Sequence, residues 1–166
     1  LLELRLDCLE PQYLNVETVD TLIRGLPNYP LIASIRNISS VPENRRNEEG
    51  FRSGKHDLDR IALLRRAVEL EVQYFELEHQ LRRNFFLGGD RRIPQTIISY
   101  YNAKETPPIN ELGRIYEEIL KQGADSVKIE TLVRTQKDRE NLLTLMEESF
   151  QFENTRPLTV VGRGKL

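Results

Sequence analysis

The sequence contains no tryptophan, one methionine, two histidines and a single cysteine, Cys8. A single cysteine excludes an internal disulfide and is typical of a reducing compartment, so we expect a cytoplasmic protein. His56 and His79 have no metal-ligand spacing with Cys8, and no metal is expected. No apolar run approaches the roughly 20 residues that cross a bilayer. The net charge of −2 favours neither a nucleic-acid partner nor an anionic membrane surface.

The length and composition are those of one globular domain. The 166 residues are 39% hydrophobic and 30% charged, which is enough to build a core. No low-complexity stretch or linker interrupts them, so we predict a single domain over residues 1–166. The chain begins at Leu1 inside one strand-like run and stops at Leu166 just after another, so we expect a fragment of a longer protein.

Short apolar or alternating runs recur along the chain and predict strands at 1–6, 30–36, 73–78, 95–101, 124–130 and 157–161. Amphipathic segments between most of them predict helices at 16–25, 57–71, 109–122 and 136–150. Asn15 is expected to cap the first helix, and Pro107 and Pro108 are expected in the first turn of the third. Strands that alternate with helices predict an α/β fold with a parallel sheet.

Two α/β architectures are compatible with this order, an open doubly wound sheet and a closed barrel. A glycine-rich phosphate turn after the first strand would favour the open sheet. The sequence has Asp7-Cys8-Leu9-Glu10-Pro11 there, with no glycine. The long polar segment 37–54 is either a functional loop or a solvated insertion.

Polar side chains share one face in most of the predicted strands, because side chains alternate between the two faces of a strand. The shared faces carry Glu3, Arg5 and Asp7; Ile32, Ser34 and Arg36; Glu76 and Glu78; Ile97, Ser99 and Tyr101; and Ser126, Lys128 and Glu130. An isolated buried charge is costly, so we expect these faces to converge on one polar centre. In a barrel, groups at the carboxyl ends of strands line the active site. An exposed edge is the alternative for the first strand taken alone.

Lys128 has two roles open to it in such a centre. It can be a counter-ion for Glu3 or Glu78. It can also be a nucleophile toward a carbonyl, if its surroundings favour the neutral amine. A Schiff base acidifies the adjacent carbon, which makes elimination or aldol chemistry accessible. The residues alone do not choose between these roles.

Six segments occur in a characteristic order: Glu3-Leu4-Arg5-Leu6-Asp7, Ser34-Ile35-Arg36, Tyr74-Phe75-Glu76-Leu77-Glu78, Ser99 to Pro107, Ala124 to Ile129, and Thr159 to Leu166. They resemble the E-L-R-x-D, T-x-R, D-x-E, S-x-H-D-F-x-x-T-P and A-D-x-x-K segments, and the strand before the M-G-x-x-G turn, of type I 3-dehydroquinate dehydratases. The ordered set extends over nearly the whole chain.

This resemblance implies a (β/α)8 TIM barrel, incomplete here, with about six strands present and the first and last strands missing. It implies a carbon–oxygen lyase of the shikimate pathway, which serves aromatic amino acid biosynthesis. The reaction converts 3-dehydroquinate to 3-dehydroshikimate by loss of water, without cofactor or metal. Lys128 would form the Schiff base. Substrate binding would fall to Glu3, Arg5, Arg36, Ser99 and Glu78. The expected partner is this small molecule, and a homodimer is considered.

The chain departs from the family pattern at three points. Tyr101 stands where the family has its catalytic histidine, and tyrosine is a poor base at neutral pH. Glu48 matches the family glutamate when counted back from Gly54, although Glu49 is a competing alignment. The carboxylate-binding arginine of the family would lie beyond Leu166.

Three functions are therefore weighed. The leading hypothesis is the dehydratase, which the combination of Lys128, Glu3, Arg5 and Arg36 favours. A non-catalytic homologue that binds a ligand or regulates is the alternative, which Tyr101 favours. A third hypothesis is another lysine-dependent barrel enzyme, such as an aldolase-like lyase with a different carbonyl substrate.

Overall fold

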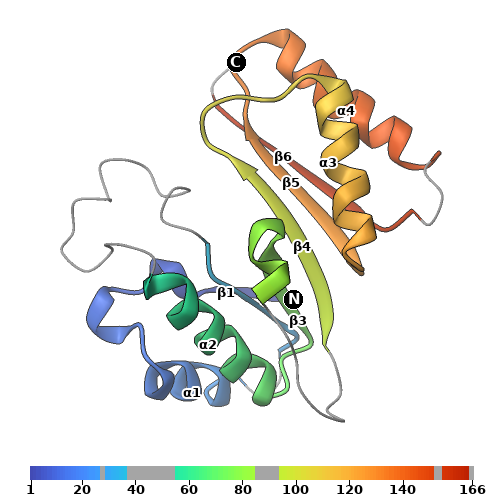
Figure 1. Cartoon of the computed structure of the whole chain (residues 1–166). Helices are drawn as coiled ribbons and strands as arrows, with labels where there is room; N and C mark the ends of the chain where they lie inside the picture. Colours follow the sequence, from blue (N-terminus) through green and yellow to red (C-terminus); the bar gives the residue numbers. More distant parts are fainter. Residues whose placement is uncertain (27–28, 37–54, 85–93, 152–154, 165–166) are drawn as a thin grey trace. The chain divides into compact units, whose positions relative to one another are not determined.

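The computed structural model describes residues 1–26, 29–36, 55–84, 94–151 and 155–164. Within these ranges six strands and four α-helices succeed one another along the chain (Figure 1). The strands are β1 (Leu2–Arg5), β2 (Leu31–Ser34), β3 (Tyr74–Glu78), β4 (Gln95–Asn102), β5 (Ser126–Leu132) and β6 (Leu158–Arg163). The helices are α1 (Val16–Arg24), α2 (Lys55–Glu69), α3 (Ile109–Lys121) and α4 (Gln136–Ser149). These elements confirm the predicted ones, with small shifts at their ends. None of the described helices has the length and apolar composition that crossing a bilayer requires.

The chain divides into two compact units, Leu1–Thr96 and Ile97–Leu166. In the first unit, β1 pairs with β2 and β2 with β3, all in parallel. One face of these strands packs on α1 and α2, and the core between them includes Leu6, Val19, Ala33, Leu64 and Phe75. The apolar residues of β1 and β2, such as Leu4 and Leu31, belong to this core, so the polar residues between them occupy the other face.

The first strand is shorter than predicted, and Asp7 lies in the turn that follows it. β1 ends at Arg5, and Leu6–Cys8 form a 3₁₀ turn in which the Leu9 amide donates to the Leu6 carbonyl at 3.1 Å. The alternation of side chains stops where the extended backbone stops. Asp7 still contacts its predicted neighbour, because it accepts hydrogen bonds from the Arg5 guanidinium, one of them at 3.0 Å.

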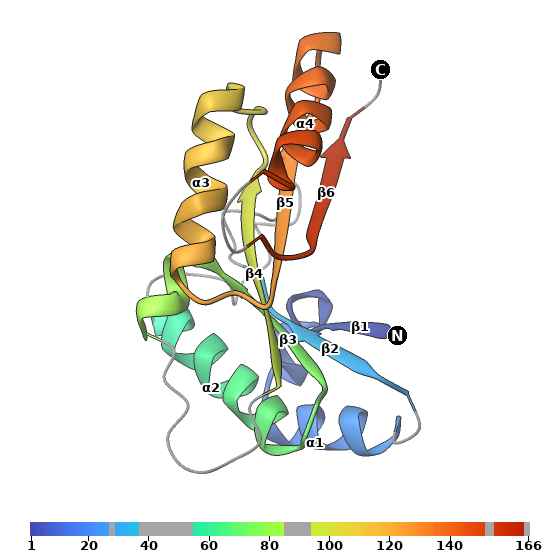
Figure 2. The same cartoon turned by 90° about the vertical axis from the view of Figure 1, so that its right-hand side faces the viewer.

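The second unit contains almost all of β4 together with β5 and β6, again in parallel and in chain order. Figure 2 shows α3 and α4 along the same side of these strands. The core on that side includes Ile98, Leu112, Tyr116, Val127 and Ile129, each of them completely buried.

Helix starts follow the sequence signals with one difference. The Asn15 side chain accepts from the Thr18 amide at 2.9 Å, which confirms the predicted cap of α1. Pro108 occupies the N-cap of α3 rather than its first turn, and its carbonyl accepts from the amides of Glu111 and Leu112 at 3.0 Å. α4 begins with a reciprocal capping box between Thr135 and Asp138.

Candidate functional site

The second unit carries Lys128 on the face of its strands that the helices leave uncovered. Val127 and Ile129 lie in the core under α3 and α4, so the residues that alternate with them occupy the opposite side. That side is lined by Ile97, Ser99 and Tyr101 on β4, by Ser126, Lys128 and Glu130 on β5, and by Thr159, Val161 and Arg163 on β6. We call Ser99, Tyr101, Lys128, Glu130 and Arg163 the lysine face. The predicted alternation on β4 and β5 is confirmed.

The strand register sets the order of these residues across the lysine face. Ser99 pairs with Lys128, and Tyr101 pairs with Glu130 in the next row. Lys128 and Tyr101 are both half-buried, whereas Ser99 is 4% exposed. An amine, a phenol and a hydroxyl therefore lie within two rows of one sheet.

Arg163 joins this face from β6, and sequence analysis missed it. Its guanidinium forms an ion pair with Glu130, whose side chain is only 4% exposed. The guanidinium carbon also lies 5.5 Å from the ring centroid of Tyr101, within the range of a cation–π contact. The predicted strand ended at residue 161, two residues too early. Continuing the alternation of Thr159 and Val161 would have placed Arg163 on this face.

The backbone around Arg163 is held tightly against the end of β5. The Val133 amide donates to the Arg163 carbonyl at 2.6 Å. Gly164 has a φ of +138°, and a Cβ there would lie 2.0 Å from the Val133 carbonyl oxygen. Only glycine is compatible with this approach. The start of the Arg163 side chain is thereby fixed relative to β5.

The first unit has a polar face of its own. Register pairs Arg5 with Ser34 and Ser34 with Glu76. The Ser34 hydroxyl donates to Glu3 Oε1 at 2.8 Å, so a predicted binding residue of β1 is bonded to a polar residue of the neighbouring strand. Ser34, Arg36, Glu76 and Glu78 are all buried. The hydrogen bond to Asp7 raises the pKa of Arg5 above its usual value, which keeps this guanidinium charged.

Arg60 of α2 organises the end of that polar face, and sequence analysis did not single it out. Its Nη2 donates to the Ile35 carbonyl at 2.7 Å and lies 3.6 Å from Glu78 Oε1. Arg60 is 5% exposed, so both contacts are buried. A signal was present, because Arg60 shares one helical stripe with the buried Leu64 and Ala67.

The predicted site residues thus fall into two groups, each described within its own unit. Glu3, Arg5, Arg36 and Glu78 belong to the first unit, and Ser99, Tyr101 and Lys128 belong to the second. The convergence of the two groups stays a prediction. Glu48 and its competitor Glu49 lie outside the described residues. Within the described ranges, no three histidine, cysteine, aspartate or glutamate side chains are placed to hold a metal ion.

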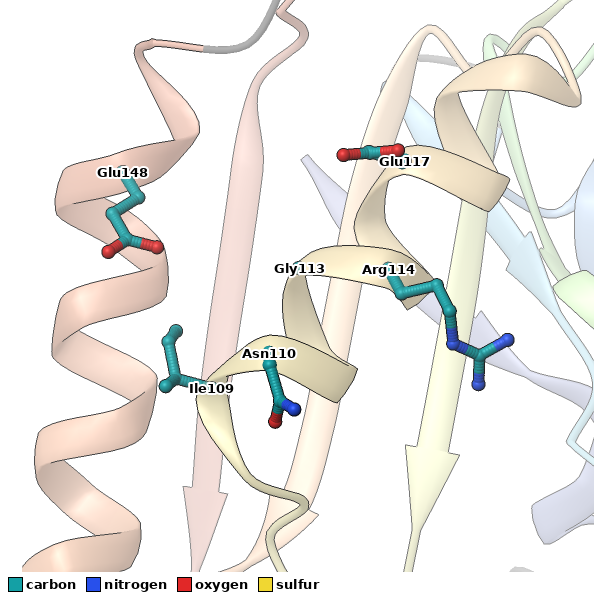
Figure 3. A pocket seen from close by; sticks show the side chains of 6 residues that line it. All are labelled: Ile109, Asn110, Gly113, Arg114, Glu117 and Glu148. Atoms are coloured by element: carbon teal, nitrogen blue, oxygen red, sulfur yellow. The ribbon is translucent and has the colours of Figure 1, made fainter.

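A groove on the other side of the second unit has no share in this chemistry. It lies between α3 and α4 and is lined by Ile109, Asn110, Gly113, Arg114, Glu117 and Glu148 (Figure 3). Glu148 comes from α4 and the other five residues from α3. Arg114 is engaged by Glu118 at 2.8 Å on the helix surface. The groove contains none of the predicted site residues, and it is formed by helices on the side opposite to Lys128.

Comparison with known proteins assigns the family. The model of the type I 3-dehydroquinase family matches residues 1–166. A 3-dehydroquinate dehydratase of Methanococcus maripaludis is 31% identical over 121 residues, which are 70% of this chain and 55% of that protein. One from Methanopyrus kandleri is 30% identical over 146 residues, or 87% of this chain and 60% of that protein. The chain therefore spans little more than half the length of these curated relatives.

Solved structures agree on the fold. The type I 3-dehydroquinate dehydratase of Clostridium difficile, solved with covalently modified comenic acid, matches 96% of this chain and 63% of its own, with a TM-score of 0.75 and 19% identity. The enzyme of Enterococcus faecalis matches 99% of this chain and 68% of its own, with a TM-score of 0.71 and 17% identity. The predicted fold class, an incomplete (β/α)8 TIM barrel, is confirmed. Its motifs, its fold and the match along its whole length show that this chain belongs to the type I 3-dehydroquinase family.

Proposed function

We propose that the protein is a 3-dehydroquinate dehydratase that converts 3-dehydroquinate to 3-dehydroshikimate through a Schiff base on Lys128. The observation that carries the proposal is the position of Lys128. Its amine projects from the middle of β5 on the face without helices, in a chain that matches the family model from end to end. An amine on this face is not covered by α3 and α4, whereas one on the opposite face would be.

The neutral amine of Lys128 attacks the ring ketone, and loss of one water gives the imine. The imine draws electrons from the neighbouring C2, so a base can remove a proton there. The electron pair left behind forms the C1–C2 double bond as the C1 hydroxyl departs with a proton, as water. A water molecule then hydrolyses the imine, which releases 3-dehydroshikimate and restores Lys128. The net change is the loss of one water.

Tyr101 and Glu48 take the positions of the acid/base pair in this proposal. The phenol of Tyr101 can donate a hydrogen bond or a proton to the departing hydroxyl. A neutral phenol is a weak base, so the histidine of the family would serve proton removal better. Ser99, in the row of Lys128, can hydrogen-bond a substrate hydroxyl.

The first unit supplies substrate-binding groups in the same proposal. Glu3, Arg5, Arg36 and Glu78 would hold hydroxyls and charge on the substrate. The arginine fork suits this task because it forms directional, charge-assisted bonds. The bond between Ser34 and Glu3 supports the role, since it orients one of these carboxylates in advance.

The test is covalent trapping. The protein is incubated with 3-dehydroquinate and borohydride, the formation of the enone product is followed by its absorbance, and the adduct is mapped by mass spectrometry. We expect product in the absence of borohydride and a reduced adduct on Lys128 in its presence. Lys128→Gln should abolish both. Lys121→Gln is the matched control, because Lys121 is an exposed lysine of α3 and should retain both signals.

The other outcomes of the trapping experiment distinguish the alternative functions. An adduct without product means that the imine forms and elimination fails. Binding of 3-dehydroquinate without adduct or product supports the non-catalytic homologue and contradicts our proposal. Turnover of a different carbonyl compound through Lys128, with none of 3-dehydroquinate, means a different lysine-dependent lyase.

Tyr101→His is a second test. If the missing histidine limits the rate, this variant should turn over faster than the parent protein. No gain in rate would show that Tyr101 is not the limiting defect. The comparison requires that both proteins unfold at the same denaturant concentration.

We also propose a cytoplasmic location and a homodimeric assembly. A lone cysteine, Cys8, exposed on the surface is consistent with a reducing compartment. Light scattering at several protein concentrations measures the mass. A mass of one chain throughout would contradict the dimer.

A further inference from the structure

We propose that Arg163 is a positioning residue that fixes the ring of Tyr101 on the lysine face, with Glu130 as its anchor. The inference rests on the proposed function, because it assigns Tyr101 to the reaction. It goes beyond that function by adding two residues, Arg163 and Glu130, to which the family resemblance assigns no role. Each supporting observation lies within the second unit.

Arg163 is anchored by Glu130. Glu130 is buried on β5, and a buried carboxylate is stabilised by a paired cation. Arg163 supplies such a cation from the neighbouring strand β6 through its Nε. The tight approach of Gly164 to Val133 and the hydrogen bond from the Val133 amide hold the carbonyl of this arginine and the residue after it. Both the start and the end of the Arg163 side chain are therefore fixed.

Arg163 also contacts the ring of Tyr101. The guanidinium lies 5.5 Å from the ring centroid, while its Nε is held by Glu130. A planar guanidinium can accept an ion pair at one edge and stack on a ring with its face at the same time. A lysine at this position could provide the charge but not both contacts. The ring of Tyr101 is thus held from the β6 side by a fixed group.

The Tyr101 ring that Arg163 contacts lies close to Lys128 on the lysine face. Tyr101 lies one row away from the Ser99–Lys128 row in the strand register, so its phenol belongs to the same patch as the amine. Acid–base catalysis depends on the position of the group that transfers the proton. Arg163 itself is assigned no contact with the reacting atoms, so its effect should pass through Tyr101.

A double-mutant cycle tests this route. Arg163→Gln should lower the rate of product formation by about tenfold or more, since a positioned acid–base group contributes roughly 10²–10⁴-fold. The rate of imine trapping on Lys128 should fall much less. Arg163→Lys should be as stable as the parent protein, but its rate of product formation should stay low. In a Tyr101→Phe background, Arg163→Gln should have almost no further effect on the rate, because the group it positions is already gone.

A merely structural role would give a different pattern. Arg163→Gln would then reduce trapping and product formation together, and it would multiply with Tyr101→Phe instead of coupling to it. Either result overturns the inference. Arg114→Gln is the matched control, since Arg114 is an exposed, ion-paired arginine of α3 on the helix side. It should leave both rates unchanged.

A spectroscopic readout keeps the inference testable if the parent protein neither traps nor turns over substrate. That result would refute the proposed function alone. The six tyrosines are labelled with 3-fluorotyrosine, and the Tyr101 resonance is assigned by its loss in Tyr101→Phe. Arg163→Gln should shift or broaden the Tyr101 resonance and leave in place that of Tyr116, a fully buried residue of α3. An unmoved Tyr101 resonance would refute the positioning role.

Discussion

Each unit has an arginine that pairs with a buried carboxylate, and the two arginines come from different kinds of element. In the first unit, Arg60 reaches from helix α2 to the Ile35 carbonyl and Glu78, at the ends of two neighbouring strands. In the second unit, Arg163 extends from the adjacent strand β6 to Glu130 and Tyr101. Both arginines meet a carboxylate that is at least nine-tenths buried. Neither was expected from the alternation of the strand that carries its partner.

The difference shows how a strand can carry carboxylates on a buried face. A buried carboxylate is stabilised by a paired cation, and in each unit the cation comes from a neighbouring element. In the first unit this element is a helix whose stripe is otherwise apolar. In the second it is a strand whose end is held by a glycine. The first arrangement should depend on side-chain chemistry, and the second should depend on backbone geometry as well.

The largest expected effect tests the helix-borne arginine. Arg60→Met removes a buried cation beside Glu78 and a donor to the Ile35 carbonyl. Breaking a buried ion pair on one side costs roughly 3–5 kcal/mol, so the free energy of unfolding should fall by about that amount. Denaturant unfolding measures the loss, and hydrogen exchange should locate it in β2, β3 and α2.

Arg66→Met is the matched control on the same helix. Arg66 pairs with Asp20 and Glu69 at the surface of the first unit, where its side chain is 30% exposed. Surface ion pairs contribute little, so this variant should lose far less stability. Equal losses in the two variants would contradict the special role given to Arg60.

The next effect tests the backbone of the second unit. Gly164→Ala places a Cβ against the Val133 carbonyl, which requires the backbone to move. We expect a loss of about 2 kcal/mol, in the range of strained backbone and overpacked sites. Gly123→Ala is the comparison, because Gly123 has a φ of +80° but nothing within 4 Å of the added atom. A loss at Gly123 as large as at Gly164 would mean that the close approach is unimportant.

A smaller effect concerns the start of α4, which leads from β5 towards β6. Thr135→Ala removes the hydroxyl that accepts from the Asp138 amide at 3.2 Å. Loss of an N-cap typically costs about 1 kcal/mol, so the thermal midpoint should fall slightly. Thr135→Ser retains the acceptor and should remain close to the parent. Equal midpoints for all three proteins would show that the cap contributes nothing measurable.

The smallest effect is a pH dependence at the same cap. The Asp138 carboxylate accepts hydrogen bonds from the amides of Arg134 and Thr135 at 2.9 and 2.8 Å. Both bonds lower the pKa of Asp138 below 3.8, and the bond from the Arg134 amide has the larger effect. A lowered folded-state pKa contributes stability above the unfolded-state pKa, which is lost as pH falls through the folded value. The stability difference between the parent and Asp138→Asn should therefore be constant near neutrality and shrink below pH about 4. A difference that grows on acidification would contradict this sign.

Much of the fold could be predicted because it depends on short-range patterns. The period of two in β4 and β5 placed Ser99, Tyr101 and Lys128 on one face, and the core confirms this. The first strand was predicted one residue too long, because the 3₁₀ turn after Arg5 depends on local hydrogen bonds. Pro108 was displaced by one residue, which is within the usual uncertainty of a helix boundary.

The sequence by itself determined the order of strands and helices, the faces of the strands and the family, because each follows from local periodicity or from ordered motifs. It could not identify Arg60 and Arg163 as the cations beside Glu78 and Glu130. Their partners lie 18 and 33 positions away along the chain, and long, flexible side chains can reach many neighbours. Only strand register, helix packing and the approach of Gly164 to Val133 decided which carboxylate each arginine meets. These are properties of the assembled chain, since they depend on atoms that come together only when the elements pack.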